Sequence, residues 1–269
     1  MDYRPFIAQV LRESSQIALE HFGNGVESTT KEGSETQVLT ETDLAVGTYM
    51  LNAINQQFPD HNTINEETGG VNKKSAYTWV LDPIDGTANF AAAVPMYGIM
   101  LGLLENDIPI AGGIALPSFG ETYIAAKGQG TICNGVPIHV TSQTVLRKSL
   151  VAFGLHSKTP EGYRQHGEIV AELIPKVLNV RSSASCYDIA MVAKGRYGSF
   201  MASRGKIWDV VAPQIIIEEA GGVYTHFDGS TIDYSNAFDR LDEMFSYSMG
   251  APAIYEQVLA VVQKVLAKK

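Results

Sequence analysis

The run Trp79–Phe90 constrains this chain most, because it leads from an apolar strand through two aspartates and a glycine turn into a helix. Pro83 disfavours the α region for the residue before it, so Asp82 is expected to stay extended at the strand end. Gly86 permits the tight turn that follows. Asp82 and Asp85 can then point at one place. This arrangement predicts a site for divalent metal ions.

The same run also predicts a site for an anion. Thr87 is expected to be the N-cap of the helix, whose first backbone N–H groups would point at the anion. Asp-Pro and Asp-Gly pairs also occur in ordinary surface turns, and on their own they would favour that interpretation. The downstream sequence favours a metal site beside a phosphate.

A second acidic position heads the apolar stretch Trp208–Gly222. The two glycines at its end suit a helix C-cap, and Pro213 is expected in the first helical turn, where its missing N–H is tolerated. Asp209 then lies at the N-terminus of the helix. There it could simply cap the helix and compensate the helix dipole. Together with the first run, it favours metal ligation.

A third acidic segment, Phe58–Glu67, follows a helix expected to end near Gln57. Adjacent acids in a loop are usually solvated. A magnesium site, however, needs oxygen ligands from dispersed parts of the chain, and the first run supplies only part of an octahedral shell. Glu66 is the residue expected to complete it.

These residues resemble a known family. Asp82–Phe90 looks like the first signature of the inositol monophosphatase family, and Trp208–Gly222 looks like its second. The resemblance extends to Thr40–Asp43, Phe58–Glu67 and Arg181–Arg196, so it spans nearly the whole chain in the expected order. It implies a magnesium-dependent phosphatase that acts on phosphate monoesters of small soluble molecules. It also implies a homodimer.

The resemblance assigns metal-binding and catalytic roles by position. Asp82 would bridge two metals, Glu66 and the Ile84 carbonyl would complete the first site, and Asp85 with Asp209 would hold the second. Thr87, paired with Glu66, would orient the attacking water. Asp43 matches an acid associated with a third, weaker metal position. Lys31 lies in the segment that matches a mobile loop over the site.

The substrate contacts implied by the resemblance come from two turns and the second acidic helix. The turn that carries Ala184, Ser185 and Cys186 opens a helix expected over about 185–194, which would again offer N–H groups to an anion. The expected substrate-binding residues are Asp85, Gly86, Thr87, Ala184, Ser185, Cys186, Arg204 and Asp209.

The expected chemistry uses two or three Mg²⁺ ions and a metal-activated water. Metals about 3.5–4 Å apart would neutralise the phosphate dianion and stabilise the leaving alkoxide, so no covalent nucleophile is required. Ser185 and Cys186 could suggest one, but no histidine-based triad can be demonstrated from the sequence. The histidines show no His-Glu-x-x-His spacing. Gly128–Gly130 is better explained as a hairpin turn than as a dinucleotide-binding loop.

Specificity is where the chain departs from inositol phosphatases. Aligned back from Trp208, Ala202 occupies the place of a glutamate that binds inositol hydroxyls in those enzymes, so inositol monophosphate is expected to be a poor substrate. Arg204 and Lys206 could instead recognise a second phosphate, although such side chains are more often solvated. The alternatives therefore include fructose-1,6-bisphosphatase, nucleotide bisphosphatase and histidinol-phosphatase activity. A further alternative is a regulatory binding protein with residual phosphatase activity.

Composition limits the partners and the compartment. The net charge of −9 argues against broad nucleic-acid or anionic-membrane binding. The apolar runs are too short or too interrupted to span a membrane. Two cysteines cannot form a disulfide framework, and the N-terminus lacks a signal-peptide pattern, so a cytoplasmic location is expected.

A single catalytic unit over residues 1–269 is expected, because no linker-like stretch divides the chain. Its halves would be 1–145, with an antiparallel sheet and most metal ligands, and 146–269, with Asp209 and the substrate-binding turn. Successive strands followed by alternation with helices predict a layered α/β (α+β) fold, and the resemblance implies the α-β-α-β-α sugar-phosphatase sandwich. Helices are expected at about Tyr3–Phe22, Asp43–Gln57, Gly162–Val177, Ser185–Lys194, Asp209–Ala220 and Ala253–Ala267.

Overall fold

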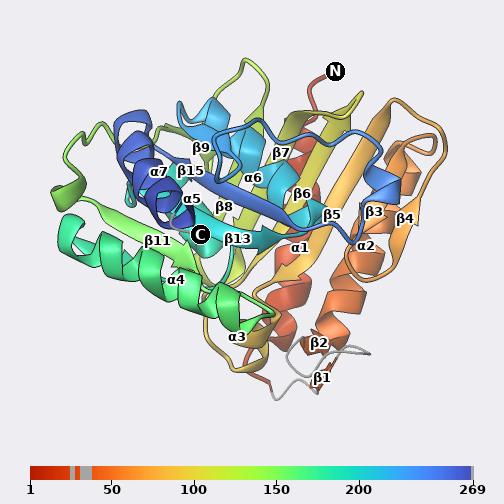
Figure 1. The fold of residues 1–269 in the computed structure, drawn as a ribbon. Helices are drawn as coiled ribbons and strands as arrows, with labels where there is room; N and C mark the ends of the chain where they lie inside the picture. The colour runs from red at the N-terminus through yellow and green to blue at the C-terminus, as the bar shows by residue number, and fades with distance from the viewer. Residues whose placement is uncertain (25–27, 31–37, 268–269) are drawn as a thin grey trace.

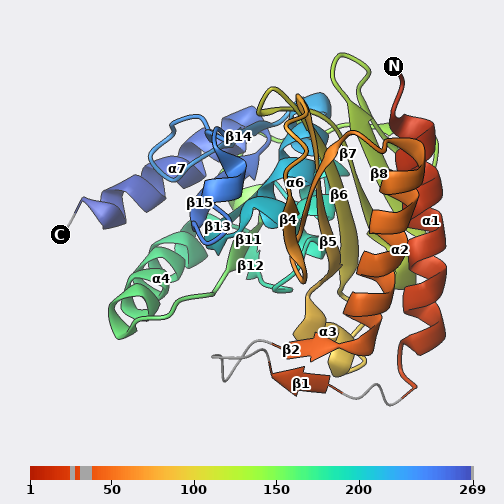
Figure 2. The ribbon, with the colours of Figure 1, turned by 90° about the vertical axis from the view of Figure 1, so that its right-hand side faces the viewer.

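The structure is a computed structural model that describes residues 1–24, 28–30 and 38–267. Within these residues the elements stack as helices, a large sheet, helices, a smaller sheet and helices, which Figures 1 and 2 show from two sides. The expected α-β-α-β-α sandwich is confirmed. In the described residues no helix is both long and apolar enough to cross a membrane.

The large sheet has the strand order β10-β9-β8-β7-β6-β5-β3-β4. Its neighbours pair antiparallel, except β3 and β5, which run parallel. The expected antiparallel series is therefore correct, and the Asn62–Asn65 part of the acidic segment adds a strand that the sequence did not indicate. The strands are β3 (Asn62–Asn65), β4 (Gly69–Val71), β5 (Tyr77–Asp85), β6 (Gly98–Glu105), β7 (Ile108–Leu116), β8 (Glu121–Ala126), β9 (Thr131–Cys133) and β10 (Val136–Ile138).

Both faces of this sheet are covered. Helices α1 (Arg4–His21) and α2 (Glu41–Gln57) pack on one face around Trp79 and other buried apolar side chains, and α6 (Ile207–Glu219) packs on the other. Gly102 and Gly112 pair across β6 and β7 beneath α6. A Cβ built on Gly102 would lie 2.6 Å from a Val211 methyl, and one built on Gly112 would lie 3.0 Å from the Ala212 Cα. The glycines therefore let α6 approach the sheet backbone.

Helix α6 differs from its expected form in one respect. It begins at Ile207, so Pro213 lies inside the helix and not in its first turn. The expectation was wrong because Asp209 was taken as the start of the helix, whereas Ile207 and Trp208 already belong to its first turn. Proline has no N–H, so the Asp209 carbonyl four residues earlier loses its usual helical partner. The helix persists because nearly all of its middle side chains are buried between the two sheets.

The smaller sheet has the order β12-β11-β13-β15-β14. Strands β12, β11 and β13 run parallel, while β15 pairs antiparallel with both β13 and β14. Helices α4 and α7 cover its outer face, and α5 and α6 cover its inner face. The bounds are β11 (Leu150–Gly154), α4 (Pro160–Leu173), β12 (Asn179–Arg181), α5 (Tyr187–Ala193), β13 (Ser199–Gly205), β14 (Val223–Thr225), β15 (Phe245–Gly250) and α7 (Pro252–Leu266).

A small antiparallel pair, β1 (Ser28–Thr30) and β2 (Val38–Thr40), lies near the short helix α3 (Thr87–Ala91) at the lower end of Figure 1. Lys31, the expected loop residue, lies outside the described residues. All strands of the large sheet lie before the smaller sheet in the chain. The large sheet's last strand ends at Ile138, and the smaller sheet's first strand begins at Leu150. The division into halves at 145 and 146 stays a prediction, since α6 from the second half packs on the first sheet.

Candidate metal and phosphate site

Three aspartates from two elements converge at one place. Asp82 and Asp85 lie at the end of β5, and Asp209 lies in the first turn of α6. Each offers a carboxylate oxygen, and these oxygens all lie within 4.8 Å of one another. The convergence that the sequence suggested for Asp82 and Asp85 is present, and Asp209 joins them.

An irregularity in β5 explains how Asp82 and Asp85 share a direction. Residues three apart on a regular strand point to opposite faces. Here the pairing of β5 with β6 shifts register between Asp82 and Asp85, as a β-bulge does. Gly86 follows with φ of 83°, a left-handed conformation that favours glycine. The one extra residue in β5 brings both carboxylates near Asp209, and the glycine turn then leads the chain into α3.

The electrostatics of the cluster favour the binding of a cation. Asp82 is buried, and its Oδ1 has no hydrogen-bond partner among the described residues. Burial raises the pKa of Asp82 well above its ordinary value, and the charges of Glu66, Asp85 and Asp209 raise it further. Burial likewise raises the pKa of Asp85 to about 6, although the backbone N–H of Cys186 partly opposes this. Clustered carboxylates, one buried and two half-buried, are costly without a cation, and oxygen ligands of this kind suit magnesium, calcium or manganese. The donor set therefore fits a divalent metal.

Glu66 lies beside this cluster. It follows β3, and its backbone N–H donates to the Leu81 carbonyl at 3.3 Å, which sets it next to the end of β5. Its charge raises the pKa of both Asp82 and Asp85. The sequence selected Glu66 for its place in an acidic segment. The structure adds the reason for its proximity, which is the parallel pairing of β3 with β5.

Thr87 connects α2 to the segment Asp82–Gly86, which we call the metal turn because it carries two of the candidate metal ligands. Its hydroxyl lies 2.9 Å from the Ile84 carbonyl and 3.3 Å from Asp43 Oδ1. Asp43 is buried, and its Oδ2 accepts a 2.8 Å hydrogen bond from the backbone N–H of Thr40, which completes a capping box at the start of α2. Thr87 is the first residue of α3, and the N-cap is Gly86, so the N-cap expectation was wrong by one residue. The pairing of Thr87 with Glu66 stays a prediction.

The expected substrate turn lies directly against the metal turn. The backbone N–H of Cys186 donates to Asp85 Oδ2, and Ala184 has φ of 57°, which is unusual for a residue other than glycine. A Cβ on Gly86 would lie 2.8 Å from the Ser185 Cβ, so only glycine leaves room for this contact. Helix α5 begins at Tyr187, two residues later than expected, so residues 184–186 form the turn itself.

Two residues that the sequence analysis missed hold this turn. Asn89 Nδ2 donates to the Ser183 carbonyl at 2.7 Å and to the Met96 carbonyl at 2.6 Å. Asp188 is buried and accepts a 2.8 Å hydrogen bond from the Ser183 N–H. Their signals were an amide inside the first run and an acid in the first turn of an apolar helix. Neither signal indicates a partner far away in sequence.

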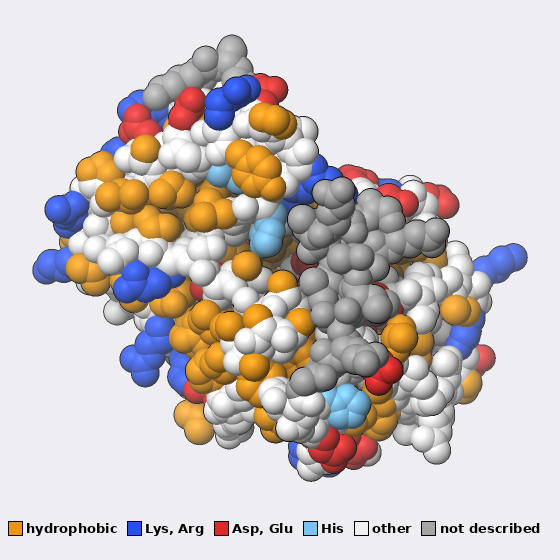
Figure 3. Space-filling view, turned by 90° about the horizontal axis from the view of Figure 1, so that it is seen from below, with side chains coloured by type: hydrophobic (Ala, Val, Ile, Leu, Met, Phe, Trp, Pro, Cys, Tyr) orange, Lys and Arg blue, Asp and Glu red, His pale blue; other side chains and the backbone are white. Residues whose placement is uncertain are grey.

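The positions linked to specificity differ in their surroundings. Ala202 is buried in β13 and offers no polar atom. Arg204 is half-buried, and no hydrogen bond or ion pair links it to the described residues. It lies near His156, whose pKa is lowered by burial and then by the Arg204 charge. Lys206 is already engaged, because its Nζ lies 3.1 Å from Asp242 and 3.2 Å from the Leu241 carbonyl. Figure 3 shows that histidine and hydrophobic side chains occupy the middle of the face seen from below.

Comparisons with known proteins identify the family of the chain. The model of the inositol monophosphatase family matches residues 2–266. A Thermotoga maritima protein named fructose-1,6-bisphosphatase/inositol-1-monophosphatase is 30% identical over 267 residues, covering 99% of this chain and 98% of that protein. The solved structure of a Thermotoga maritima IMPase is 28% identical and superposes with a TM-score of 0.88 over 100% of this chain and 99% of its own.

A further structure shows the fold with ligands. It is an IMPase/NADP phosphatase complexed with Mg²⁺ and phosphate, and it is 22% identical, with a TM-score of 0.81 over 95% of this chain and 92% of its own. At this identity it supports the fold alone.

The family match covers the chain from its first element to its last helix, and metal-dependent hydrolysis of phosphate monoesters is the family's activity. This chain therefore belongs to the inositol monophosphatase family and is a phosphoric monoester hydrolase.

Proposed function

We propose that this chain hydrolyses its phosphate monoester with two or three Mg²⁺ ions. The observation that carries the proposal is the cluster of Asp82, Asp85 and Asp209, in which a buried Asp82 oxygen has no hydrogen-bond partner among the described residues. Glu66 and the Ile84 carbonyl would complete the first metal site. Asp43 would contribute to a third, weaker position, although both of its oxygens already face protein donors.

When bound, the metals supply positive charge to the phosphate and a water of lowered pKa. The remaining work falls to the chain itself. Thr87, with Glu66, orients the attacking water, and the Ile84 carbonyl holds the Thr87 hydroxyl in place. Gly86 and the 184–186 turn contact the phosphate and the substrate body. The Cys186 N–H fixes the Asp85 carboxylate and so joins substrate binding to metal binding.

The substrate proposed first is a monophosphate of a small soluble molecule. The family relationship and the name of the Thermotoga relative support inositol 1-phosphate as a member of this class. Ala202 supplies no polar atom for an inositol hydroxyl, so inositol 1-phosphate is proposed to be a poor substrate compared with other monophosphates. A homodimer in the cytoplasm is part of the proposal, and light scattering on the purified protein tests the dimer.

The test is phosphate release from a panel of inositol 1-phosphate, histidinol phosphate, adenosine 3′,5′-bisphosphate and fructose 1,6-bisphosphate. Chelation should stop release and added Mg²⁺ should restore it. Restoration by zinc alone, or release that survives chelation, would contradict the proposed chemistry. A strong preference for inositol 1-phosphate would contradict the Ala202 argument while leaving the metal site intact.

A second candidate, a bisphosphate substrate, is favoured by Arg204. Arg204 is half-buried near His156 and has no carboxylate partner among the described residues, whereas Lys206 pairs with Asp242. Arginine binds phosphate through two parallel hydrogen bonds. Fructose 1-phosphate and fructose 1,6-bisphosphate form a matched pair, since they share one phosphate and differ in the second.

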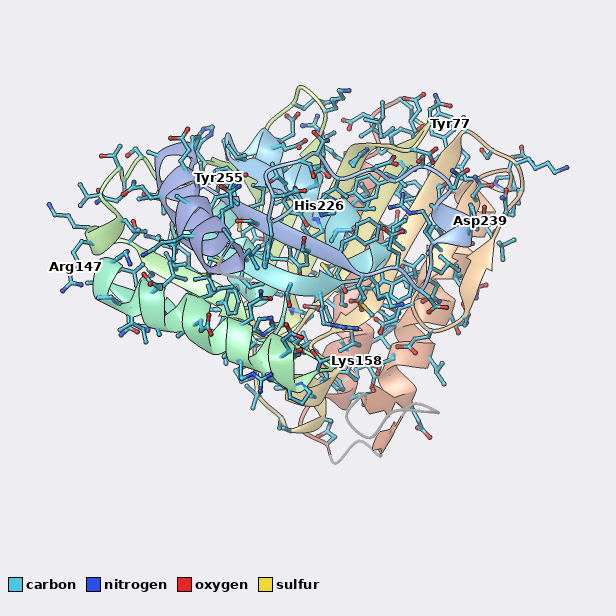
Figure 4. The ribbon with its side chains drawn as sticks, in the orientation of Figure 1. Tyr77, Arg147, Lys158, His226, Asp239 and Tyr255 are labelled. Carbon is cyan, nitrogen blue, oxygen red and sulfur yellow. The ribbon has the colours of Figure 1, made fainter. Side chains whose placement is uncertain are left out.

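Arg204→Ala should lower kcat/KM for the bisphosphate by about tenfold and leave the monophosphate unchanged. Arg147→Ala is the control, because Arg147 is exposed in the short helix Leu146–Lys148, and Figure 4 labels it at the far left, beside one end of α4. Equal losses for the two substrates would contradict the second-phosphate candidate.

A further inference from the structure

Gly47 lies in the middle of α2, where a glycine needs an explanation. A glycine inside a helix is less favourable than alanine by about 0.5–1 kcal/mol. The backbone at Gly47 is helical, so no unusual dihedral angle requires glycine there. The cause must therefore be the space around the residue, since a Cβ is the only group that glycine lacks.

That space is filled by the two segments that carry Glu66 and Asp82. A Cβ built on Gly47 would lie 3.1 Å from Asn65 Nδ2 and 3.1 Å from Pro83 Cγ. Both distances are shorter than ordinary van der Waals contacts. Asn65 immediately precedes Glu66, and Pro83 immediately follows Asp82, so one helical position touches the neighbours of two carboxylates in the proposed metal set.

Both contacted residues are held firmly. Asn65 is fully buried, donates to the Thr68 hydroxyl at 3.0 Å and accepts from the Glu67 N–H at 3.1 Å. Pro83 is buried in β5 within the irregular part of the strand. Neither can move away without displacing the chain beside it. A side chain on Gly47 would therefore shift the backbones on which Glu66 and Asp82 stand.

Asp43 lies one helical turn before Gly47, so the two share a face of α2. Asp43 accepts from Thr40 and faces the Thr87 hydroxyl, while Gly47 faces Asn65 and Pro83. One face of this helix thus contacts the segments that carry the water-orienting threonine and two acidic ligands. Helices are stiff, so the separation of those segments is fixed by α2.

We propose that Gly47 is a positioning residue, whose missing side chain sets the spacing between Glu66 and Asp82 and thereby the affinity for metal. The inference rests on the proposed metal site and adds a residue that binds nothing itself. It predicts that metal affinity depends on the size of residue 47, separately from the stability of the fold.

The experiment compares Gly47→Ala and Gly47→Val with Gly167→Ala. Gly167 is an exposed glycine inside α4, and a Cβ there meets nothing within 4 Å. Mg²⁺ binding is measured by titration calorimetry without substrate, and thermal unfolding is measured in chelator. The Mg²⁺ dissociation constant should rise about threefold for the alanine variant and about tenfold or more for the valine variant. Gly167→Ala should bind Mg²⁺ as the native chain does.

The readouts separate the possible failures. If the native chain binds no Mg²⁺, the proposed function fails. If the native chain binds Mg²⁺ and both Gly47 variants bind it equally well, the positioning role fails. A loss of affinity that follows the loss of metal-free stability would also contradict it. The double variant Gly47→Ala with Asn65→Ser should recover part of the affinity, because serine vacates the space of the Asn65 amide while its hydroxyl can still accept from Glu67.

Discussion

Asn89 donates a 2.7 Å hydrogen bond to the carbonyl of Ser183, which lies far along the chain. The same amide group donates to the Met96 carbonyl, so both of its N–H hydrogens are used. Asn89 belongs to α3, directly after the metal turn, and Ser183 begins the turn that leads to Cys186. The bond therefore joins the proposed metal-binding part of the site to the proposed substrate-binding part.

Asn89→Asp tests this link, because the substitution keeps the shape and removes both donors. The Ser183 carbonyl would lose its partner and face a carboxylate, so the turn should move. We expect kcat/KM to fall about tenfold to a hundredfold. Asn52→Asp is the matched control, since Asn52 is exposed on α2 and the change adds the same charge. A native kcat/KM for Asn89→Asp in a folded protein would show that the link is dispensable.

Asp82→Asn should abolish hydrolysis, by about a thousandfold or more, while the fold is kept. The change removes the proposed bridging charge without altering side-chain size. It should also stabilise the metal-free protein, because burial and neighbouring carboxylates already disfavour the charged form of Asp82. Phosphate release and thermal unfolding in chelator measure the two effects. Asp239→Asn, at an exposed position marked in Figure 4, is the control and should change neither.

Metal affinity should rise with pH until the carboxyl groups are ionised. The folded pKa of Asp85 is raised to about 6 from an ordinary 3.8, so the metal-free fold holds protons that the unfolded chain releases. Protonated Asp85 therefore stabilises the metal-free fold at low pH. This contribution to the free energy of unfolding is lost as the pH rises through about 6. Bound Mg²⁺ offsets the loss. The rise in melting temperature on adding Mg²⁺ should therefore be larger at about pH 7.5 than at about pH 5. An equal rise at both values would contradict this prediction.

Ala184→Gly should stabilise the protein by about 0.5–1 kcal/mol, because Ala184 has a positive φ that costs an alanine more than a glycine. Denaturant unfolding measures the change. Ala171→Gly is the control, since Ala171 is exposed in α4, where glycine should destabilise by about 1 kcal/mol. Opposite signs for the same substitution are the expected result, and equal signs would show that Ala184 is not strained.

Local signals made much of the fold predictable. The predicted bounds of the long helices are correct to within a few residues. Their apolar periodicity is strong, and proline or glycine marks their ends, as at the start of α7 and the end of α6. The strands of the large sheet that the sequence did not indicate are short. β4 and β10 have too few buried side chains for their alternation to be visible. Pro213 shows the limit for helices, since burial between two sheets overrode an unfavourable residue.

For the site, the sequence indicated which carboxylates matter but not how they meet. The pairing of β3 with β5, which brings Glu66 to the end of β5, is a contact between segments whose sequences do not specify their neighbours. The bulge in β5 depends on the register of β6. The roles of Asn89 and Gly47 could not be predicted for the same reason. Their partners are distant in the sequence, and only the folded chain identifies them.

Gly102 and Gly112 leave a strip without side chains on the large sheet, and α6 covers it. The last strand of that sheet ends at Ile138, but α6 begins at Ile207. During synthesis the sheet therefore emerges from the ribosome well before its second cover. Until α6 arrives, the strip exposes backbone and apolar surface, a state prone to aggregation. A nascent chain stopped before Ile207 should then need a chaperone, and one stopped just after α6 has emerged should not.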